Sequence, residues 1–231
     1  MKQYKSIDYA KVAIGTYIYA FDKLDGSNLR FEWDKKLSKK SNFTNGFKKF
    51  GTRKQMIYKN DPNWGHAIDL FYDKYAEHLD KIFNEDKDFR NARKITVFCE
   101  YYGEQSFAGW HSPEDKKNNK MELTLIDVDV FQKGIVTPKD FIKKFSHLGI
   151  PDIVYQGMYN QQLIDDVRNG VYNLVEGVVI KGTRLTKKKG VENTFMEKVK
   201  TNEWLERLKQ IHPQKLLEEV NGDKSLLVNI K

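Results

Sequence analysis

The chain has 231 residues, of which 39% are hydrophobic and 13% aromatic, so it can bury a core and is not an intrinsically disordered chain. Forty Lys and Arg against 32 Asp and Glu leave a net charge of +8. That surplus favours a polyanionic partner such as nucleic acid, although basic proteins without such a partner are common.

The cysteine content and the hydropathy of the chain indicate the cellular compartment of the protein. The single cysteine, Cys99, has no partner for an intramolecular disulfide, which favours a reducing compartment. No apolar stretch approaches the roughly 20 residues that cross a bilayer, and the first residues do not resemble a secretory signal. We expect a soluble cytoplasmic protein that does not enter a membrane.

The first part of the chain predicts two strands and a basic segment. Residues 17–21 and 28–33 have strand composition, and Asp25-Gly26-Ser27 between them favours a tight connection. Residues 34–55 are polar and rich in lysine. Two interpretations of this segment stay open, a solvated loop and a surface that contacts a nucleic-acid strand.

The middle of the chain predicts one long helix, two strands and two short helices. Apolar residues at helical spacing predict a core-facing helix over 66–83. Residues 94–100 and 122–131 resemble strands joined by a polar loop. Helix-start and helix-stop residues then predict helices over about 137–149 and 160–170.

The last part predicts two more strands and a helix. Strands are expected at 174–181 and 194–200, joined by a basic loop at 184–190. A helix over 202–211 should stop before Pro213. Strands and helices follow one another without regular βαβ alternation, which predicts an α+β fold of mostly antiparallel sheets with flanking helices.

The most informative segment is Lys-Leu-Asp-Gly-Ser-Asn at residues 23–28, which places Lys23 and Asp25 beside a permissive glycine. Such a turn also occurs by chance as a solvated hairpin. A lysine that attacks a phosphorus must be a free amine, so nearby cations or desolvation must lower its pKa. Lys198 and Lys200 supply cations from one strand face, unless that face simply meets solvent.

Two carboxylates are candidates for the divalent cation that phosphoryl transfer requires. Glu100 ends an apolar run, and Glu176 lies among apolar residues of an expected strand. Burial of a carboxylate in such a strand costs on the order of several kcal/mol unless the carboxylate is paired or binds metal. The alternative for Glu176 is an edge-strand residue that faces water.

Four segments, taken in order, resemble motifs I, III, IV and V of the covalent nucleotidyltransferase superfamily: residues 23–28, 98–103, 176–181 and 197–200. The superfamily includes DNA ligases, RNA ligases and mRNA capping enzymes. Ser27-Asn28 and the opening Tyr4-Lys5-Ser6-Ile7 are similar to RNA ligases of the nick-sealing type. The resemblance implies a nucleotidyltransferase (adenylyltransferase) domain.

The resemblance also implies the cofactors, which are ATP, with AMP carried covalently on Lys23, and Mg²⁺ or Mn²⁺. Glu176 would bind the metal, and Asp25 would orient the metal or Lys23. Lys198 and Lys200 would contact the phosphates.

Three further residues are assigned to the nucleotide by the resemblance. Glu100 would contact the ribose or a metal-bound water, while Asn28 and Arg53 would contact the nucleotide. Related proteins commonly stack an aromatic side chain on the adenine, but Leu123 and Leu125 occupy the matching positions in this chain.

The resemblance ends near Lys200, which suggests a catalytic domain over 1–200 and a short helical tail over 201–231. The function it implies is ATP-dependent joining of 3′-hydroxyl and 5′-phosphate ends of nucleic acid, preferably RNA, by a monomer. The alternatives are a minimal DNA ligase and a non-catalytic nucleic-acid-binding protein, and a capping guanylyltransferase fits less well.

Overall fold

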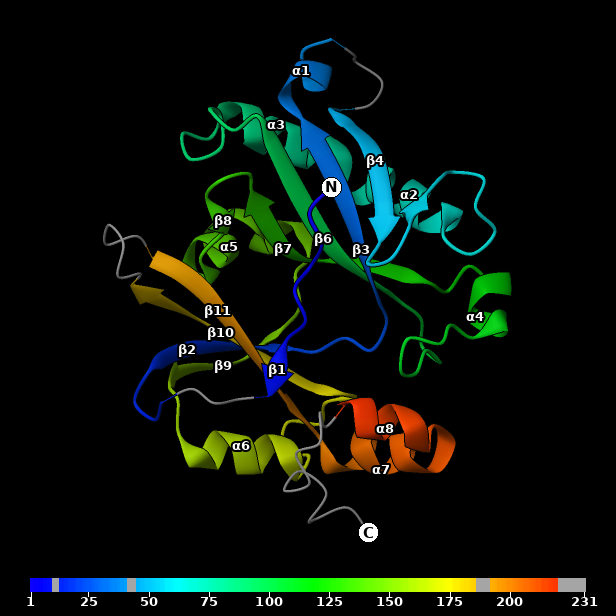
Figure 1. Ribbon diagram of the computed structural model, residues 1–231, viewed down its shortest axis with the longest axis vertical. Coiled ribbons are helices and arrows are strands. Elements are labelled where there is room, and N and C mark those ends of the chain that lie inside the picture. Colours follow the sequence, from blue (N-terminus) through cyan, green and yellow to red (C-terminus); the bar gives the residue numbers. More distant parts are fainter. Residues whose placement is uncertain (10–12, 41–44, 186–191, 220–231) are drawn as a thin grey trace. The chain divides into compact units, whose positions relative to one another are not determined.

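The computed structural model describes residues 1–9, 13–40, 45–185 and 192–219. They divide into two compact units (Figure 1). Unit 1 contains the described residues within Met1–Ser6, Gly26–Pro151 and Thr183–Thr194. Unit 2 contains the described residues within Ile7–Asp25, Asp152–Gly182 and Phe195–Lys231. Within the described part, no helix is long and apolar enough to span a membrane.

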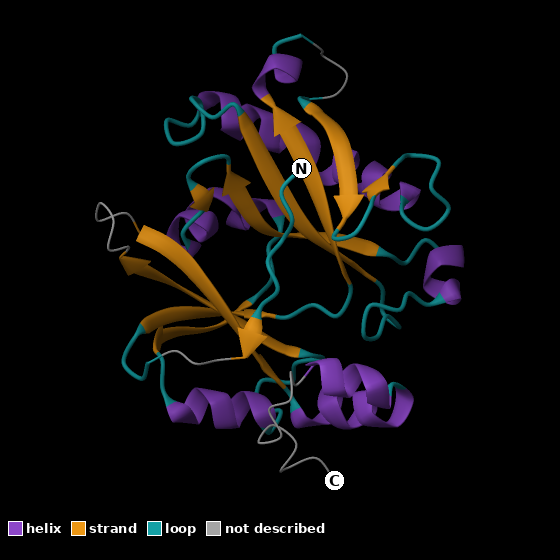
Figure 2. Cartoon of the chain, in the orientation of Figure 1, coloured by secondary structure: helices purple, strands orange, loops and turns teal. Residues whose placement is uncertain are grey.

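Unit 1 contains a six-stranded antiparallel sheet in the order β5-β4-β3-β6-β7-β8. Strands are drawn in orange and helices in purple in Figure 2. The strands are β3 (Ser27–Asp34), β4 (Phe47–Thr52), β5 (Met56–Ile57), β6 (Lys94–Tyr102), β7 (Glu122–Val130) and β8 (Gly134–Ile135). Successive side chains of its central strands point to opposite faces of the sheet. On the face that meets the core, the register partners Leu29 and Cys99 are both fully buried.

The predicted long helix packs on this sheet. It consists of α2 (Gly65–Phe71), a π-helical turn (Tyr72–Ala76) and α3 (Glu77–Glu85), which confirms the expectation for 66–83. The Phe71 ring stacks on Phe31 of β3 at a centroid distance of 3.9 Å, and the Tyr75 hydroxyl donates to the Leu123 carbonyl at 2.9 Å. The aromatic stripe is therefore core.

The two predicted short helices are also confirmed. They are α5 (Pro138–Phe145) and α6 (Gln161–Arg168), and the N-cap side chains of Thr137 and Asn160 accept from backbone N–H groups of the first turn. A 3₁₀ turn (Ser146–Leu148) extends α5 to Gly149, which has a φ of 80°.

The five-stranded sheet, most of whose residues belong to unit 2, has the order β1-β11-β10-β2-β9. Its strands are β1 (Asp8–Tyr9), β2 (Tyr17–Asp22), β9 (Ile153–Met158), β10 (Gly177–Leu185) and β11 (Glu192–Lys200). Helix α6 covers one face, because Leu163 and Val167 pack in one cluster with Ile18, Val178 and Val199. The α+β class with mostly antiparallel sheets is confirmed.

Two helices end the described part of unit 2. Helix α7 (Asn202–Ile211) is capped by Thr201 and stops where predicted, and α8 (Pro213–Glu219) begins at the proline that prevents α7 from continuing. The boundary expected at residue 200, between a catalytic domain and a short helical tail, stays a prediction.

Several local predictions were wrong. Strands β2 and β3 lie in different sheets, so Asp25-Gly26-Ser27 does not close a hairpin. The segment 34–55 is not a solvated loop throughout, because α1 (Lys35–Ser38) and β4 lie within it and Phe47 is fully buried; residues 41–44 lie outside the described part. The apolar pairing of β4 with β3 outweighs the lysine content that suggested a loop.

Other elements were missed or misplaced. The polar loop between β6 and β7 contains α4 (Pro113–Lys117), and strand β9 was not predicted. Strand β10 starts at Gly177, so Glu176 precedes the strand instead of lying inside it. Most of the predicted basic loop 184–190 falls outside the described residues, apart from its first two, which extend β10.

Candidate active site

Lys23 and Glu176 form the centre of the candidate site in unit 2. Lys23 follows the last residue of β2, and its backbone N–H donates to the Gly177 carbonyl at 2.9 Å. This contact places the Lys23 side chain beside Glu176, with Nζ 2.8 Å from Oε1. Glu176 is only 3% exposed, so the solvent-facing alternative for this residue is excluded.

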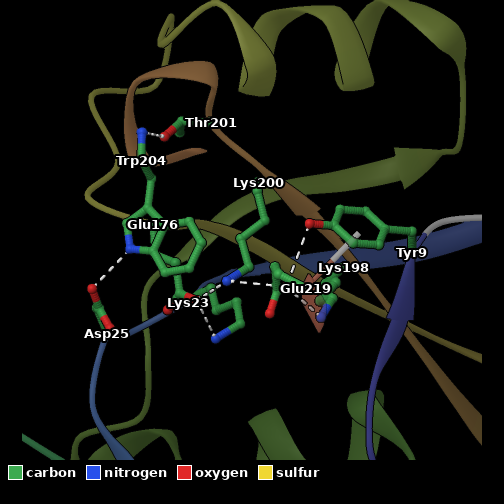
Figure 3. A network of polar contacts seen from close by, with 9 residues as sticks. All are labelled: Tyr9, Lys23, Asp25, Glu176, Lys198, Lys200, Thr201, Trp204 and Glu219. Atoms are coloured by element: carbon green, nitrogen blue, oxygen red, sulfur yellow. Dashed lines mark hydrogen bonds and ion pairs between the residues drawn. The ribbon is translucent and has the colours of Figure 1, made fainter. Parts of the chain in front are cut away.

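Lys200 is the second cation on Glu176. Its Nζ pairs with the same Oε1 and lies 3.4 Å from the centroid of the Trp204 ring (Figure 3). Burial raises the pKa of Glu176, but the charges of Lys200 and Lys23 outweigh burial and hold the pKa below its usual value. Burial lowers the pKa of Lys200. The charge of Glu176 opposes this decrease, and the charge of Lys23 adds to it.

Glu219 of α8 links the two lysines of β11. Its Oε1 is 2.6 Å from Lys198 Nζ and 3.3 Å from Lys200 Nζ, and it accepts from the Tyr9 hydroxyl at 3.4 Å (Figure 3). Burial raises the pKa of Glu219, but Lys200 and Lys198 overcome that effect and lower it to about 2. The strand face of Lys198 and Lys200 therefore meets a carboxylate instead of solvent.

Asp25 is held by the same helical region. The Trp204 indole Nε1–H donates to Asp25 Oδ2 at 2.8 Å, and both groups are buried. Trp204 itself is positioned by the N-cap of α7, where its backbone N–H donates to Thr201 Oγ1 at 3.1 Å. One tryptophan thus contacts both Asp25 and Lys200.

A further carboxylate lies next to this network. Asp22 is the residue before Lys23, and its Oδ1 is buried without a hydrogen-bond partner among the described residues. Burial, then Asp152 and Glu176, raise the pKa of Asp22 to about 6, against the opposing charge of Lys23. Asp22 is therefore a buried carboxyl group with a raised pKa immediately before Lys23.

The other predicted residues belong to unit 1. Asn28 of β3 and Glu100 of β6 are register partners, so both side chains leave the same face of the sheet. That is the face opposite the Leu29 and Cys99 side chains. The Asn28 Nδ2 atom is buried and has no hydrogen-bond partner in the described residues, which leaves a donor to be satisfied.

Arg53 follows β4 and is exposed. Its carbonyl accepts from the Gln3 side chain at 3.1 Å, which ties it to the N-terminal segment. Glu100 and Arg53 act with opposite sign on Tyr4, whose pKa is raised chiefly by burial. Arg53 and Glu100 are thus both within electrostatic range of one buried tyrosine.

Neither leucine at the expected adenine-stacking positions is accessible. Leu123 and Leu125 are both fully buried in unit 1. Among the described residues, no cluster of three or more His, Cys, Asp or Glu side chains is arranged to hold a metal ion.

The sequence missed several residues in and around the network, among them Glu219, Trp204 and Asp22. Glu219 and Trp204 lie beyond the last motif, where no sequence pattern pointed to them. Asp22 had a clearer signal, because a carboxylate immediately before a nucleophilic lysine changes its electrostatics.

The fold resembles that of solved RNA ligases. A Naegleria gruberi RNA ligase mutant with ATP and Mn aligns with a TM-score of 0.57 and 17% identity, over 90% of this chain and 58% of that one. An apo mutant of the Naegleria ligase gives 0.59 and 16%, over 91% and 58%. An archaeal ATP-dependent RNA ligase gives 0.54 and 12%, over 100% and 59%. The chain thus spans less than two thirds of these ligases.

The family model described as RNA ligase matches residues 16–219, which is most of the sequence and includes all the site residues named above except Tyr4 and Tyr9. The chain therefore belongs to the RNA ligase family. No curated protein sequence matches it.

Proposed function

We propose that the protein is an ATP-dependent RNA ligase that works through a lysyl-AMP intermediate. The Lys23 amine attacks the α-phosphorus of ATP, and the bond to pyrophosphate breaks. AMP then passes to a 5′-phosphate end, and a 3′-hydroxyl attacks that phosphate and expels AMP. The observation that carries the proposal is the convergence of Lys23 and Lys200 on the buried Glu176 in a chain of the RNA ligase family.

Lys23 needs to lose a proton before it attacks. In the structure its contact with Glu176 favours the charged ammonium. Release of Lys23 from Glu176 leaves the amine beside the positive charge of Lys200, which favours the neutral nucleophile. Lys23 therefore has to leave Glu176 before it attacks.

Glu176 fits a magnesium or manganese ion. Magnesium binds proteins through one or two carboxylates and keeps water or substrate phosphates as its other ligands, which suits a single buried carboxylate. When bound, the ion neutralises charge that develops on the phosphates. Asp25, fixed by Trp204, is the residue that would orient the metal or Lys23.

Lys198 and Lys200 are assigned to the phosphates of ATP. Glu219 supports this assignment, because its carboxylate already contacts both ammonium groups with an oxygen that can stand in for a phosphate oxygen. A triphosphate bound there replaces Glu219 as the partner of the two lysines.

The nucleotide contacts assigned to unit 1 are those of Asn28, Glu100 and Arg53. The unsatisfied donor of Asn28 costs about 1–3 kcal/mol as a buried group, and an acceptor on the nucleotide recovers that cost. Glu100, its register partner, offers an acceptor for a ribose hydroxyl or a metal-bound water. Arg53 offers an exposed cation.

The substrate is nucleic acid with 5′-phosphate and 3′-hydroxyl ends, with RNA preferred. The net charge of +8 supports a polyanion, and the protein is proposed to act as a cytoplasmic monomer. The comparisons favour neither the DNA ligase nor the non-catalytic alternative.

Sealing assays test this proposal. The purified chain, Mg²⁺ and ATP are combined with three nicked duplexes of one sequence, in which the strands to be joined are both RNA, both DNA, or one of each. Fastest sealing of the RNA nick is expected. Fastest sealing of the DNA nick contradicts the RNA preference, and no ATP-dependent sealing of any duplex contradicts ligase activity.

A further inference from the structure

The turn over residues 107–110 in unit 1 presents an aromatic ring that no assigned role uses. Trp110 is 56% exposed, although tryptophan is among the side chains that gain most from burial. The turn closes by reciprocal backbone hydrogen bonds between Phe107 and Trp110, at 3.0 and 2.8 Å. A fixed turn with an exposed indole is typical of a contact surface.

The backbone of this turn is strained. Ala108 has a φ of 50° and Gly109 a φ of 75°, and a left-handed conformation at the alanine is uncommon for a residue with a Cβ atom. Strain of this kind costs about 1–3 kcal/mol and persists only where the surroundings enforce it. In this turn, the residues on either side enforce the strained conformation.

His111 anchors the turn to motif I. Its Nε2 atom is 3.0 Å from Ser27 Oγ and its Nδ1 atom is 3.3 Å from Ser106 Oγ, which accepts from the Gly103 N–H at 2.8 Å. Burial, followed by the charge of Lys116, lowers the pKa of His111 to about 4, against Asp115, so the imidazole is neutral at pH 7 and bridges two hydroxyls.

The turn also lies close to Gly26 and Ser27. A Cβ atom on Gly109 would be 3.7 Å from the Gly26 carbonyl oxygen and 4.0 Å from Ser27 Oγ. The rings of Trp64 and Tyr101 flank His111, each at a centroid distance of 5.3 Å. Trp110 is therefore held in one place relative to Gly26, three residues after Lys23 in the chain.

The charge of the segment argues against a phosphate contact. Residues 103–120 contain three basic and three acidic side chains, and their formal charges cancel: Lys116, Lys117 and Lys120 against Glu104, Glu114 and Asp115. What this segment offers is a flat, uncharged ring. Every nucleobase has a π face that stacks on such a ring, so a nucleobase is the ligand that fits.

We propose that Trp110 is a stacking platform for a nucleobase of the polynucleotide substrate. The inference rests on the proposed function. The strained and buttressed turn holds the indole ready before the strand arrives, so that little ordering is lost on binding. Trp110 contributes to nucleic-acid affinity and takes no part in the reaction of Lys23 with ATP.

Binding measurements with Trp110→Ala test the proposal. Dissociation constants for a nicked RNA duplex are measured without ATP at several salt concentrations. Loss of one stacked base should weaken binding about 5- to 100-fold. The slope of log affinity against log salt should not change, because no phosphate contact is removed. Trp110→Phe, which keeps a ring, should bind within about threefold of the native chain.

Phe131→Ala is the matched control, because Phe131 is 55% exposed in the same unit. It should bind the duplex as the native chain does. Uptake of label from ATP should be unchanged in all these variants. If the native chain takes up no label while Trp110→Ala still loses nucleic-acid affinity, the proposed function fails and the platform stands.

Photocrosslinking supplies a test that needs no variant. Nicked RNA with 5-iodouridine at successive positions beside the nick should crosslink to Trp110 from one or two positions, as mapped by mass spectrometry. The proposal is overturned by crosslinks that avoid Trp110, by unchanged binding of Trp110→Ala, or by a change in its salt slope. A native dimer that Trp110→Ala turns into a monomer with full RNA affinity also overturns it.

Discussion

The two units hold their candidate site residues in different ways. In unit 2, Lys23, Glu176, Lys200 and Glu219 are bonded to one another, and Glu176 and Lys200 are each 3% exposed. In unit 1, Asn28 and Glu100 stand on one face of a sheet whose other face is core. The site in unit 2 is part of what stabilises the unit, whereas the site in unit 1 rests on a core that does not depend on it.

This difference predicts that substitutions in unit 2 change stability and chemistry together, while those in unit 1 change nucleotide binding with little effect on stability. A buried ion pair that loses one partner leaves an uncompensated charge. A half-buried polar residue on a sheet face leaves no such charge.

The largest effect is expected for Glu176→Ala. Removal of this carboxylate leaves Lys200 buried beside Lys23, which should lower the free energy of unfolding by about 3–5 kcal/mol. Urea titration of the variant measures this change. Glu104→Ala is the control, because the Glu104 side chain is 76% exposed and its pair with Lys120 should matter little. Equal stability of the two variants contradicts the buried network.

A smaller loss of stability is expected for Trp204→Phe. The phenyl ring can still lie under Lys200, but the donor to Asp25 is gone, which should cost about 1.5–3 kcal/mol. Labelling from ATP should slow as well if Asp25 positions Lys23 or the metal. The variant Trp110→Phe, which removes an exposed indole, serves as the control for both measurements.

Glu219→Gln should show a dependence on pH. The folded-state pKa of Glu219 is about 2 against an ordinary value of 4.5, so its stabilising contribution is complete above about pH 4.5 and is lost as the pH falls toward 2. The variant should be less stable than the native chain at pH 7, by on the order of 2 kcal/mol, and the gap should narrow below pH 4.5. A gap that stays constant between pH 7 and 3 argues against this charge.

The smallest effect on stability is expected in unit 1, for Asn28→Ala. Removal of the side chain ends the cost of the unsatisfied donor but also removes packing, so the two effects should largely cancel and change the free energy of unfolding by less than about 1 kcal/mol. The ATP concentration needed for half-maximal labelling should nevertheless rise. Thermal unfolding and an ATP titration of the same preparation separate the two effects, and a large loss of stability would remove the distinction between the units.

The sequence predicted the main helix and central strands of unit 1 and the motif lysines and carboxylates of unit 2, but not the residues that hold those motif residues in place. Residues 66–83 had a clear helical period, and the partners Asn28 and Glu100 lie in strands that could be recognised from composition. Glu219 and Trp204 could not be predicted, because their role depends on where α7 and α8 fold back, which no local pattern encodes. The prediction for segment 34–55 failed for a different reason. Its many lysines indicated a solvated loop, although Phe47 within it is fully buried.

Covalent labelling tests the central claim most directly. The native chain, stripped of bound AMP with pyrophosphate, is incubated with Mg²⁺ and α-labelled ATP and then denatured, in parallel with Lys23→Ala and with Lys59→Ala, an exposed lysine of unit 1. We expect acid-labile label on the native chain and on Lys59→Ala, and none on Lys23→Ala. Substantial label on Lys23→Ala, or none on the native chain, contradicts the account.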